Sequence, residues 1–259
     1  MRFEFGKNWQ SFSKIALDEQ KINQARHDFQ DLFSGIDLKD KSFIDIGFGQ
    51  GLTLILAREA GSNALGIDID RENIYALREI LKHFPGQNEP KTRIVSILDK
   101  KFIDSQNSQN SYHIVHSWGA LHHTGSMYEA ITNASNLVSE GGYFVISIYN
   151  KHWSSPVWRL IKWFYNKSPV PIRKLLIGIF YVVIYIAKLI VTGKNPRIEN
   201  RGMEFLHNVI DWIGGYPYEY ASTKKITKFV NLLGFETLKI NPARVPTGCN
   251  EFVFKKKKE

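Results

Sequence analysis

Residues 42–150 alternate short runs rich in β-branched and aromatic residues with helical patterns, and this alternation limits the fold more than any other feature of the chain. Such alternation is typical of a parallel sheet covered by helices on both faces. We therefore expect a doubly wound α/β fold. The five strands predicted in this region are Ser42–Ile46, Ala64–Asp68, Arg93–Ile97, His113–His116 and Tyr143–Tyr149.

The α/β pattern stops after Tyr149 and resumes at Ser222. Between these residues, two Ser-Pro pairs place a capping hydroxyl before a proline that suits a first helical turn. They predict two inserted helices, over 156–166 and 169–192. The resumed pattern predicts a helix over Ser222–Leu233 and strands over Phe235–Ile240 and Asn250–Phe254.

These elements predict a mostly parallel, seven-stranded sheet built from three parts of the chain. Residues 1–150 form a core with an N-terminal helical segment. Residues 151–203 form a helical cap inserted after the fifth strand. Residues 204–259 supply a loop, the last helix and a final β-hairpin of the core.

Positive charge is concentrated in the inserted cap. The chain has a net charge of +9, and residues 151–203 carry 10 Lys and Arg against one Glu. The most apolar run, 175–191, lies in the same segment and includes Lys188. It falls short of the roughly 20 residues that span a bilayer. Two interpretations remain open: a helix buried in the cap or in a homodimer interface, and a helix lying in an anionic membrane surface.

The chain has one cysteine, Cys249, which excludes an internal disulfide framework and a cysteine-rich zinc site. The first residues lack the apolar stretch of a secretory signal. We therefore expect a cytoplasmic protein. If residues 175–191 lie in a membrane surface, the protein is expected at the inner membrane face.

A glycine-rich turn, Asp45-Ile46-Gly47-Phe48-Gly49-Gln50-Gly51, follows the first predicted strand. Glycines there let the backbone approach a ligand closely, and the next helix points its N-terminal amides at that ligand. Asp45 can pair with the ammonium of an amino-acid ligand but would repel a pyrophosphate. Asp68 ends the second strand, where a carboxylate can accept both hydroxyls of a ribose. Asp99 follows the third strand, where an adenine amino group would arrive.

These motifs, followed by Ser117-Trp118-Gly119-Ala120-Leu121-His122-His123-Thr124, resemble the successive motifs of class I S-adenosylmethionine (SAM)-dependent methyltransferases. The nearest branch is the small-molecule one that includes ubiquinone-biosynthesis O-methyltransferases. The SWGxLHHTG and DWxGGYPxE patterns, with Arg201-Gly202-Met203 and Gly248–Phe254, are also similar to a group of bacterial methyltransferases. The resemblance implies a Rossmann-like fold, with SAM as cofactor and S-adenosylhomocysteine (SAH) as its product.

The resemblance also implies roles for individual residues. Asp45, Gly47, Gly49 and Gly51 would frame the methionine part of SAM, Asp68 its ribose and Asp99 its adenine. Further predicted cofactor contacts are Ile69, Ser117, Trp118 and Trp9. For the two tryptophans, ordinary core packing is the alternative.

Two other groups of residues are candidates for the acceptor side. His122 and His123 could take a proton from an acceptor hydroxyl near neutral pH. Alternatively, one of them only fixes its loop, since methyl transfer can run on proximity and orientation alone. The segment Asp211–Glu219 is too rich in glycine and proline for regular structure and is predicted to bind the acceptor or to form a packed connector. Its predicted substrate-binding residues are Asp211, Tyr216 and Glu219.

The predicted function is methyl transfer from SAM to oxygen, with nitrogen or carbon as alternatives, of a small or lipid-linked molecule. No metal is predicted, because the His122-His123 pair lacks further ligands at metal-site spacing. An RNA methyltransferase is one alternative. However, Ser117-Trp118-Gly119-Ala120 differs from the Asn/Asp-Pro-Pro-aromatic pattern of methyltransferases that act on exocyclic amines of bases. The sequence therefore does not favour nucleic acid as a partner. The other two alternative functions are a nicotinamide-dependent oxidoreductase and a non-catalytic binding protein.

Overall fold

The computed structural model describes residues 3–107, 112–197 and 204–258. The predicted motif at Arg201-Gly202-Met203 lies outside these residues. The strands are β1 (Ser42–Ile46), β2 (Asn63–Asp68), β3 (Lys91–Ile94), β4 (Tyr112–Trp118), β5 (Val138–Tyr149), β6 (Phe235–Asn241) and β7 (Cys249–Lys256). The helices are α1 (Phe5–Ile15), α2 (Glu19–Leu32), α3 (Leu52–Glu59), α4 (Glu72–Leu81), α5 (Lys100–Asn107), the short η1 (Leu121–His123), α6 (Met127–Asn136), α7 (Ser155–Lys167), α8 (Val170–Thr192), α9 (Phe205–Gly214) and α10 (Thr223–Leu232).

All seven strands form one sheet in the order β3-β2-β1-β4-β5-β7-β6. The pairs from β3 to β5 are parallel, whereas β7 runs antiparallel to both of its neighbours, β5 and β6. The predicted α/β fold with seven strands is therefore confirmed, and the sheet is mixed rather than purely parallel.

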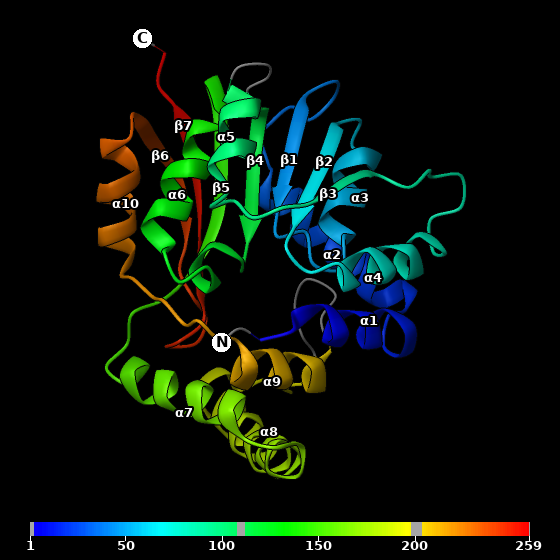
Figure 1. Cartoon of the computed structure of the whole chain (residues 1–259), viewed down its shortest axis with the longest axis vertical. Helices are drawn as coiled ribbons and strands as arrows, with labels where there is room; N and C mark the ends of the chain where they lie inside the picture. The colour runs from blue at the N-terminus through cyan, green and yellow to red at the C-terminus, as the bar shows by residue number, and fades with distance from the viewer. Residues whose placement is uncertain (1–2, 108–111, 198–203, 259) are drawn as a thin grey trace.

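Helices cover both faces of the sheet (Figure 1). One face packs against α5, α6 and α10 through a hydrophobic cluster that includes Phe102, Ile131 and Val230. The other face packs against α2, α3 and α4 through a second cluster that includes Phe29 and Leu54. Burial of these two apolar layers stabilises the sheet and fixes the ends of its strands.

A further layer of helices, α1, α7, α8 and α9, lies beyond one edge of the sheet (Figure 1). The N-terminal helix α1 is held there by a hydrogen bond from the backbone N–H of Gly6 to the Asp70 carboxylate, 2.8 Å long. Asp70 lies two residues after the end of β2, so this layer faces the carboxyl ends of the strands. Open α/β sheets bind their ligands at this edge.

Helix α8 differs from the other helices of this layer. Its most apolar window of 18 residues has a mean hydropathy of 2.4, and none of the 23 residues Val170–Thr192 is buried. By length and composition alone it could cross a membrane. The predicted pair of inserted helices after β5 is present as α7 and α8.

The strand β5 begins at Val138 rather than at the predicted Tyr143, because Val138 already pairs with Tyr112 of β4. Two further elements differ from their predicted positions near the site. The predicted strand Arg93–Ile97 is observed as β3, Lys91–Ile94, because its partner β2 ends at Asp68, which pairs with Ile94. The predicted irregular segment 211–219 begins inside a helix, because residues 211–214 form the last turn of α9. The glycines at 214 and 215 end this helix rather than prevent it.

Candidate functional site

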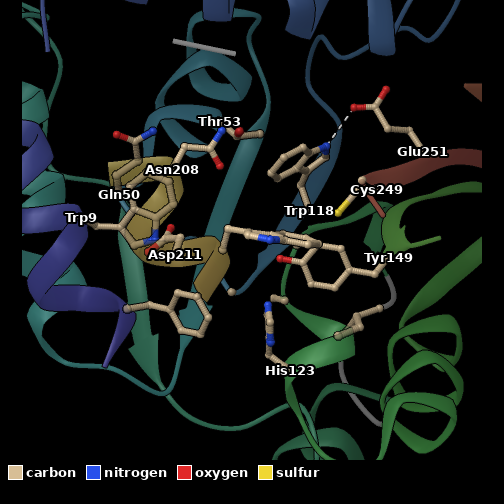
Figure 2. A pocket seen from close by; sticks show the side chains of 18 of the residues that line it. Trp9, Gln50, Thr53, Trp118, His123, Tyr149, Asn208, Asp211, Cys249 and Glu251 are labelled. Carbon is tan, nitrogen blue, oxygen red and sulfur yellow. Dashed lines mark hydrogen bonds between the residues drawn. The ribbon is translucent and has the colours of Figure 1, made fainter. Parts of the chain in front are cut away.

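A cavity of about 2240 Å³ lies between the carboxyl ends of β1, β2 and β4 and the helices α1, α8 and α9. Small-molecule pockets usually have volumes of about 300–1,000 Å³. This cavity is therefore large enough for two ligands side by side. Side chains from distant parts of the chain point into it, among them Trp9, Trp118, His123 and Asp211 (Figure 2).

The glycine-rich turn after β1 forms one wall of the cavity. Gly47, Gly49 and Gly51 have φ angles of +73°, +55° and +82°, which a side chain would make costly. A Cβ atom on Gly47 would lie 2.3 Å from the Cβ of Ala120. The turn therefore needs glycine for both its conformation and its close packing, and it presents bare backbone to the cavity.

Asp68 lies at the end of β2, beside this turn. One carboxylate oxygen accepts the backbone N–H of Gly49 at 3.1 Å, and the other accepts that of Asp70 at 2.9 Å. The side chain is 8% exposed and lines the cavity. Burial raises the pKa of Asp68 above its ordinary value, so additional hydrogen-bond donors from a ligand would stabilise its ionised form.

Asp45 also lines the cavity, but it already has a partner. Its Oδ1 lies 2.7 Å from Nδ1 of His116, and both side chains are buried. Within the part of the chain that the structure describes, the other ring nitrogen of His116, Nε2, has no hydrogen-bond partner. The pair fixes the orientation of the Asp45 carboxylate at the base of the cavity.

Three other predicted cofactor residues, Trp9, Ile69 and Trp118, line the same cavity. The indole of Trp9 lies over the glycine turn, with Nε1 3.4 Å from the position of a Cβ on Gly49. The indole N–H of Trp118 donates to Glu251 of β7 at 2.9 Å (Figure 2). The structure thus brings α1, β2, β4 and β7 together around one space.

Asp99 and Ser117, in contrast, do not line the cavity. Asp99 is exposed, and its Oδ1 accepts the backbone N–H groups of Lys101 and Phe102, so the carboxylate caps α5. The cavity wall after β3 is formed instead by 95–97. The hydroxyl of Ser117 is buried and donates to the carbonyl of Ile46 at 2.8 Å. Both side chains serve local structure.

The two adjacent histidines occupy different environments. His123 lines the cavity, and its Nδ1 lies 2.6 Å from the carbonyl oxygen of Pro217. A carbonyl can only accept, so Nδ1 carries the proton and Nε2 of the neutral ring has the lone pair. His122 is fully buried behind the cavity wall, with its ring 4.0 Å from that of Tyr149. Burial lowers the pKa of His122 well below its ordinary value.

Of the three predicted substrate-binding residues, Asp211, Tyr216 and Glu219, Asp211 alone lines the cavity. Its Oδ1 accepts from the side-chain amide of Asn8 at 2.6 Å, and desolvation raises its pKa to about 7. Glu219 accepts the backbone N–H of Met127 at 3.1 Å and so caps α6. Tyr216 contributes its carbonyl oxygen to the backbone N–H of Phe3. These last two residues fix the connection between α9 and α10.

Sequence reasoning missed a buried lysine next to Asp211. Lys162 of α7 is fully buried and donates to the carbonyl of Trp212 at the end of α9. Its ammonium lies 4.2 Å from the ring centroid of Trp212, 4.8 Å from that of Tyr218 and 5.6 Å from that of Tyr149. Burial lowers its pKa to about 7, although the charge of Asp211 opposes the shift. No signal in the sequence separates this lysine from the exposed ones around it.

Tyr149, Trp212 and Cys249 are further residues that line the cavity and that the sequence does not predict as site residues. Tyr149 and Cys249 are labelled in Figure 2. Tyr149 ends β5, so the rule that ligands bind at the carboxyl ends of strands could have identified it. Among the described residues, no three His, Cys, Asp or Glu side chains gather where they could hold a metal ion.

A family model described as a methyltransferase domain matches residues 17–174. A ubiquinone biosynthesis O-methyltransferase of Hydrogenovibrio crunogenus is 27% identical over 135 residues, which cover 52% of this chain and 53% of that protein. The match thus spans about half the length of this curated relative.

Solved structures share the fold at low sequence identity. Magnesium protoporphyrin IX methyltransferase from Synechocystis PCC 6803, solved with bound SAH, has a TM-score of 0.55 and 14% identity, with 91% of this chain and 83% of that chain covered. An O-methyltransferase family protein from Burkholderia thailandensis has a TM-score of 0.57 and 12% identity, covering 91% of this chain and 57% of that chain. Since the family model covers more than half of the residues, the chain belongs to the methyltransferase domain family.

Proposed function

We propose that this enzyme transfers the methyl group of SAM to an oxygen atom of a small or lipid-linked molecule bound in the same cavity. One observation carries the proposal: the glycine turn and Asp68 share a single cavity with His123, Tyr149 and Asp211. When bound, SAM supplies an electrophilic methyl group on a positively charged sulfur. The residues of this chain would hold both reactants in line, and such positioning accounts for much of the rate of a bimolecular transfer.

The donor side is assigned to the residues around the glycine turn. Asp45, Gly47, Gly49 and Gly51 would hold the methionine part of SAM, and Asp68 would accept the two ribose hydroxyls. The fit rests on the bare backbone of the turn and on the Asp68 carboxylate, which is desolvated and is held by the backbone N–H groups of Gly49 and Asp70 and by the side chain of Asn73. Further donor contacts would come from side chains that line the cavity near the turn: Trp9, Ile69 and Trp118. Asp99 and Ser117 are not part of this assignment.

The acceptor side is assigned to His123, Tyr149 and Asp211. The hydrogen bond to Pro217 fixes the tautomer of His123 in which Nε2 can accept a proton. We propose that His123 removes the proton of the acceptor hydroxyl, and that Asp211 helps to bind the acceptor. His122 would support the loop, because it is buried and has a low pKa.

The inserted helices would cover the acceptor side of the cavity. Trp158 of α7 and Ile184, Ala187 and Val191 of α8 line the cavity, which supports the assignment of 151–203 as a cap. The single cysteine suits a reducing compartment, and we propose a cytoplasmic enzyme.

Calorimetry tests the donor, because we expect SAM and SAH to bind and NAD not to bind. Tighter binding of NAD than of SAM would contradict the assignment.

Transfer is tested by incubating the enzyme with methyl-labelled SAM and separate lipid, small-molecule and RNA extracts from its source cells. We expect label in one of the first two extracts, and label in RNA alone would favour the nucleic-acid alternative.

With an acceptor found, His123→Asn tests the proton acceptor. General-base catalysis contributes about 10²–10⁴-fold, so kcat should fall by that factor while the Kd for SAM stays the same. His27→Asn, on the exposed side of α2, is the matched control. An unchanged kcat in His123→Asn would show that proximity and orientation suffice.

A further inference from the structure

Helix α8 exposes an apolar stripe that the rest of the described chain does not cover. Leu175 is 64% exposed, Ile179 48%, Val182 55%, Ile186 50% and Ile190 77%. They follow one another at intervals of three or four residues, so they lie on one side of the helix. Contiguous exposed apolar surface of this kind marks an interaction site in a soluble protein.

Helix α7 and the turn before it carry a second stripe. Trp153 is 82% exposed, Val157 54%, Leu160 63% and Phe164 49%, again at intervals of three or four residues. The two helices are consecutive and contact each other. Both lie at the end of the molecule away from the sheet, with α9 between α8 and the strands (Figure 1).

The opposite side of α8 is held against the protein. Tyr181 and Tyr185 pack edge-on against Phe205 of α9, at centroid distances of 4.9 Å and 5.8 Å. Ile184 and Val191 line the cavity. A helix bound along its length in this way lies flat on the protein, which suits a surface-bound helix rather than one that spans a bilayer.

The charge of this segment indicates what covers the stripes. Residues 151–197 contain nine Lys and Arg and no Asp or Glu. Most of these cations are exposed, including Arg159, Lys167, Lys174 and Lys194, whereas Lys162 is buried. Exposed apolar residues interspersed with tryptophan and basic residues match the interface of an anionic bilayer, where apolar groups meet acyl chains and cations meet headgroups.

We propose that α7 and α8 dock the enzyme on an anionic lipid bilayer and that its acceptor, an amphiphile with an apolar tail, enters the cavity from that bilayer. This inference rests on the proposed function and names its substrate class. The same helix has one side toward the bilayer and the other toward the cavity, so the cavity lies directly beside the membrane surface. The apolar wall formed by Ile184, Ala187 and Val191 would receive the tail.

Sedimentation with vesicles tests the docking step. The protein is mixed with phosphatidylglycerol or phosphatidylcholine vesicles at low and high salt. We expect strong binding to the anionic vesicles at low salt and weaker binding at high salt, because ionic screening reduces attraction to headgroups. Fluorescence of Trp153 should shift to the blue on binding, and Trp153→Phe should remove that part of the shift.

Two sets of variants separate the apolar and the basic contributions. Leu175→Glu with Ile179→Glu should abolish sedimentation, whereas Leu232→Glu, at an exposed position on α10, should not. Reversing Arg159, Lys167 and Lys174 to Glu should weaken vesicle binding by at least about 100-fold, since each basic residue contributes roughly five-fold near an anionic surface. None of these residues lines the cavity, so all variants should bind SAM normally.

The acceptor step is tested by incubating the enzyme and methyl-labelled SAM with anionic vesicles that contain a lipid extract. We expect label in the lipid fraction, at a rate that falls in Leu175→Glu with Ile179→Glu and not in Leu232→Glu. Label found only in water-soluble molecules, at equal rates in both variants, would overturn the substrate class.

Absence of vesicle binding at low salt would overturn the docking proposal. If light scattering then showed a dimer that Leu175→Glu with Ile179→Glu makes monomeric, the stripes would be an interface between two copies of the chain. The proposed function fails separately: a protein that binds vesicles but not SAM would contradict the donor assignment alone.

Discussion

The most direct test of the donor site is the replacement of Asp68 by asparagine. The carboxylate uses one oxygen for each of two backbone N–H groups, and the amide can replace only one of these acceptors. The variant also loses the negative charge that would attract the ribose hydroxyls. Hydrogen bonds to charged groups contribute about 1.5–3 kcal/mol each. If the asparagine side chain retains one of two such bonds to the ribose, the Kd for SAM should rise by about 10–150-fold.

Asp68→Ala should weaken binding further, by up to about 10⁴-fold, because both bonds are lost. Calorimetry at constant pH and salt measures both constants, and SAH serves as a second ligand. The matched control is Asp99→Asn. That carboxylate also accepts two backbone N–H groups, but it caps α5 outside the cavity. Asp99→Asn should keep the wild-type Kd, with a loss of stability of about 1 kcal/mol at most.

The pH dependence provides an independent check on Asp68. Burial raises its pKa above the ordinary value of 3.8, so the ionised form is lost at a higher pH than in an exposed aspartate. SAM affinity should therefore fall as the pH is lowered through this raised pKa, and the fall should be absent in Asp68→Asn. An unchanged Kd in Asp68→Asn, or a larger effect in Asp99→Asn, would refute the ribose assignment.

Two further predictions concern the turn and the buried pair. Gly47→Ala should lower the free energy of unfolding by about 2–5 kcal/mol, because the new Cβ overlaps with Ala120 and φ is positive. The control is Gly35→Ala, which also has a positive φ but lies in open space and should lower the free energy of unfolding by only about 1–2 kcal/mol. Equal losses in urea titrations of the two variants would argue against the overlap. Burial raises the pKa of Asp211 to about 7, so the folded protein holds this proton more tightly than the unfolded chain, and the free energy of unfolding falls as the pH rises from about 4 to 7. Burial lowers the pKa of Lys162 to about 7, so the unfolded chain holds that proton more tightly, and the free energy of unfolding falls as the pH drops toward 7 from above. Asp211→Asn should remove the first of these slopes and lower the pKa of Lys162 further, and a urea titration series with an unchanged slope between pH 4 and 7 would contradict this.

The sequence alone predicted the strands and the glycine turn because both depend on local patterns. The strand at Ser42–Ile46 was predicted with its observed bounds, since an apolar run there ends at a turn that only glycine allows. The predicted position of Asp68 at a strand end is also observed. These features need no knowledge of distant contacts.

The direction of a side chain was harder to predict, because it depends on which partner is nearest. Asp99 was expected in the cavity, but the first amides of α5 lie closer and bind its carboxylate. His122 and His123 are identical in type and adjacent, and only the turn of η1 and the carbonyl of Pro217 decide which of them reaches the cavity. The burial of Lys162 depends on its contact with the end of α9, and the glycines within 211–219 favour an irregular segment there rather than a helix.

The place of β7 in the sheet affects how the chain can fold during synthesis. β7 follows the other six described strands in the chain, yet it lies between β5 and β6, which do not pair with each other. Its residues Phe252 and Phe254 are fully buried, and Glu251 holds Trp118 at the cavity. Until the ribosome has passed Lys256, β6 has no neighbour in the sheet, and the flank of β5 remains open to chaperones or to other nascent chains. Completion of the sheet and of the cavity wall is therefore a single late event, and a nascent chain stalled before β7 should be sensitive to proteases on both sides of that gap.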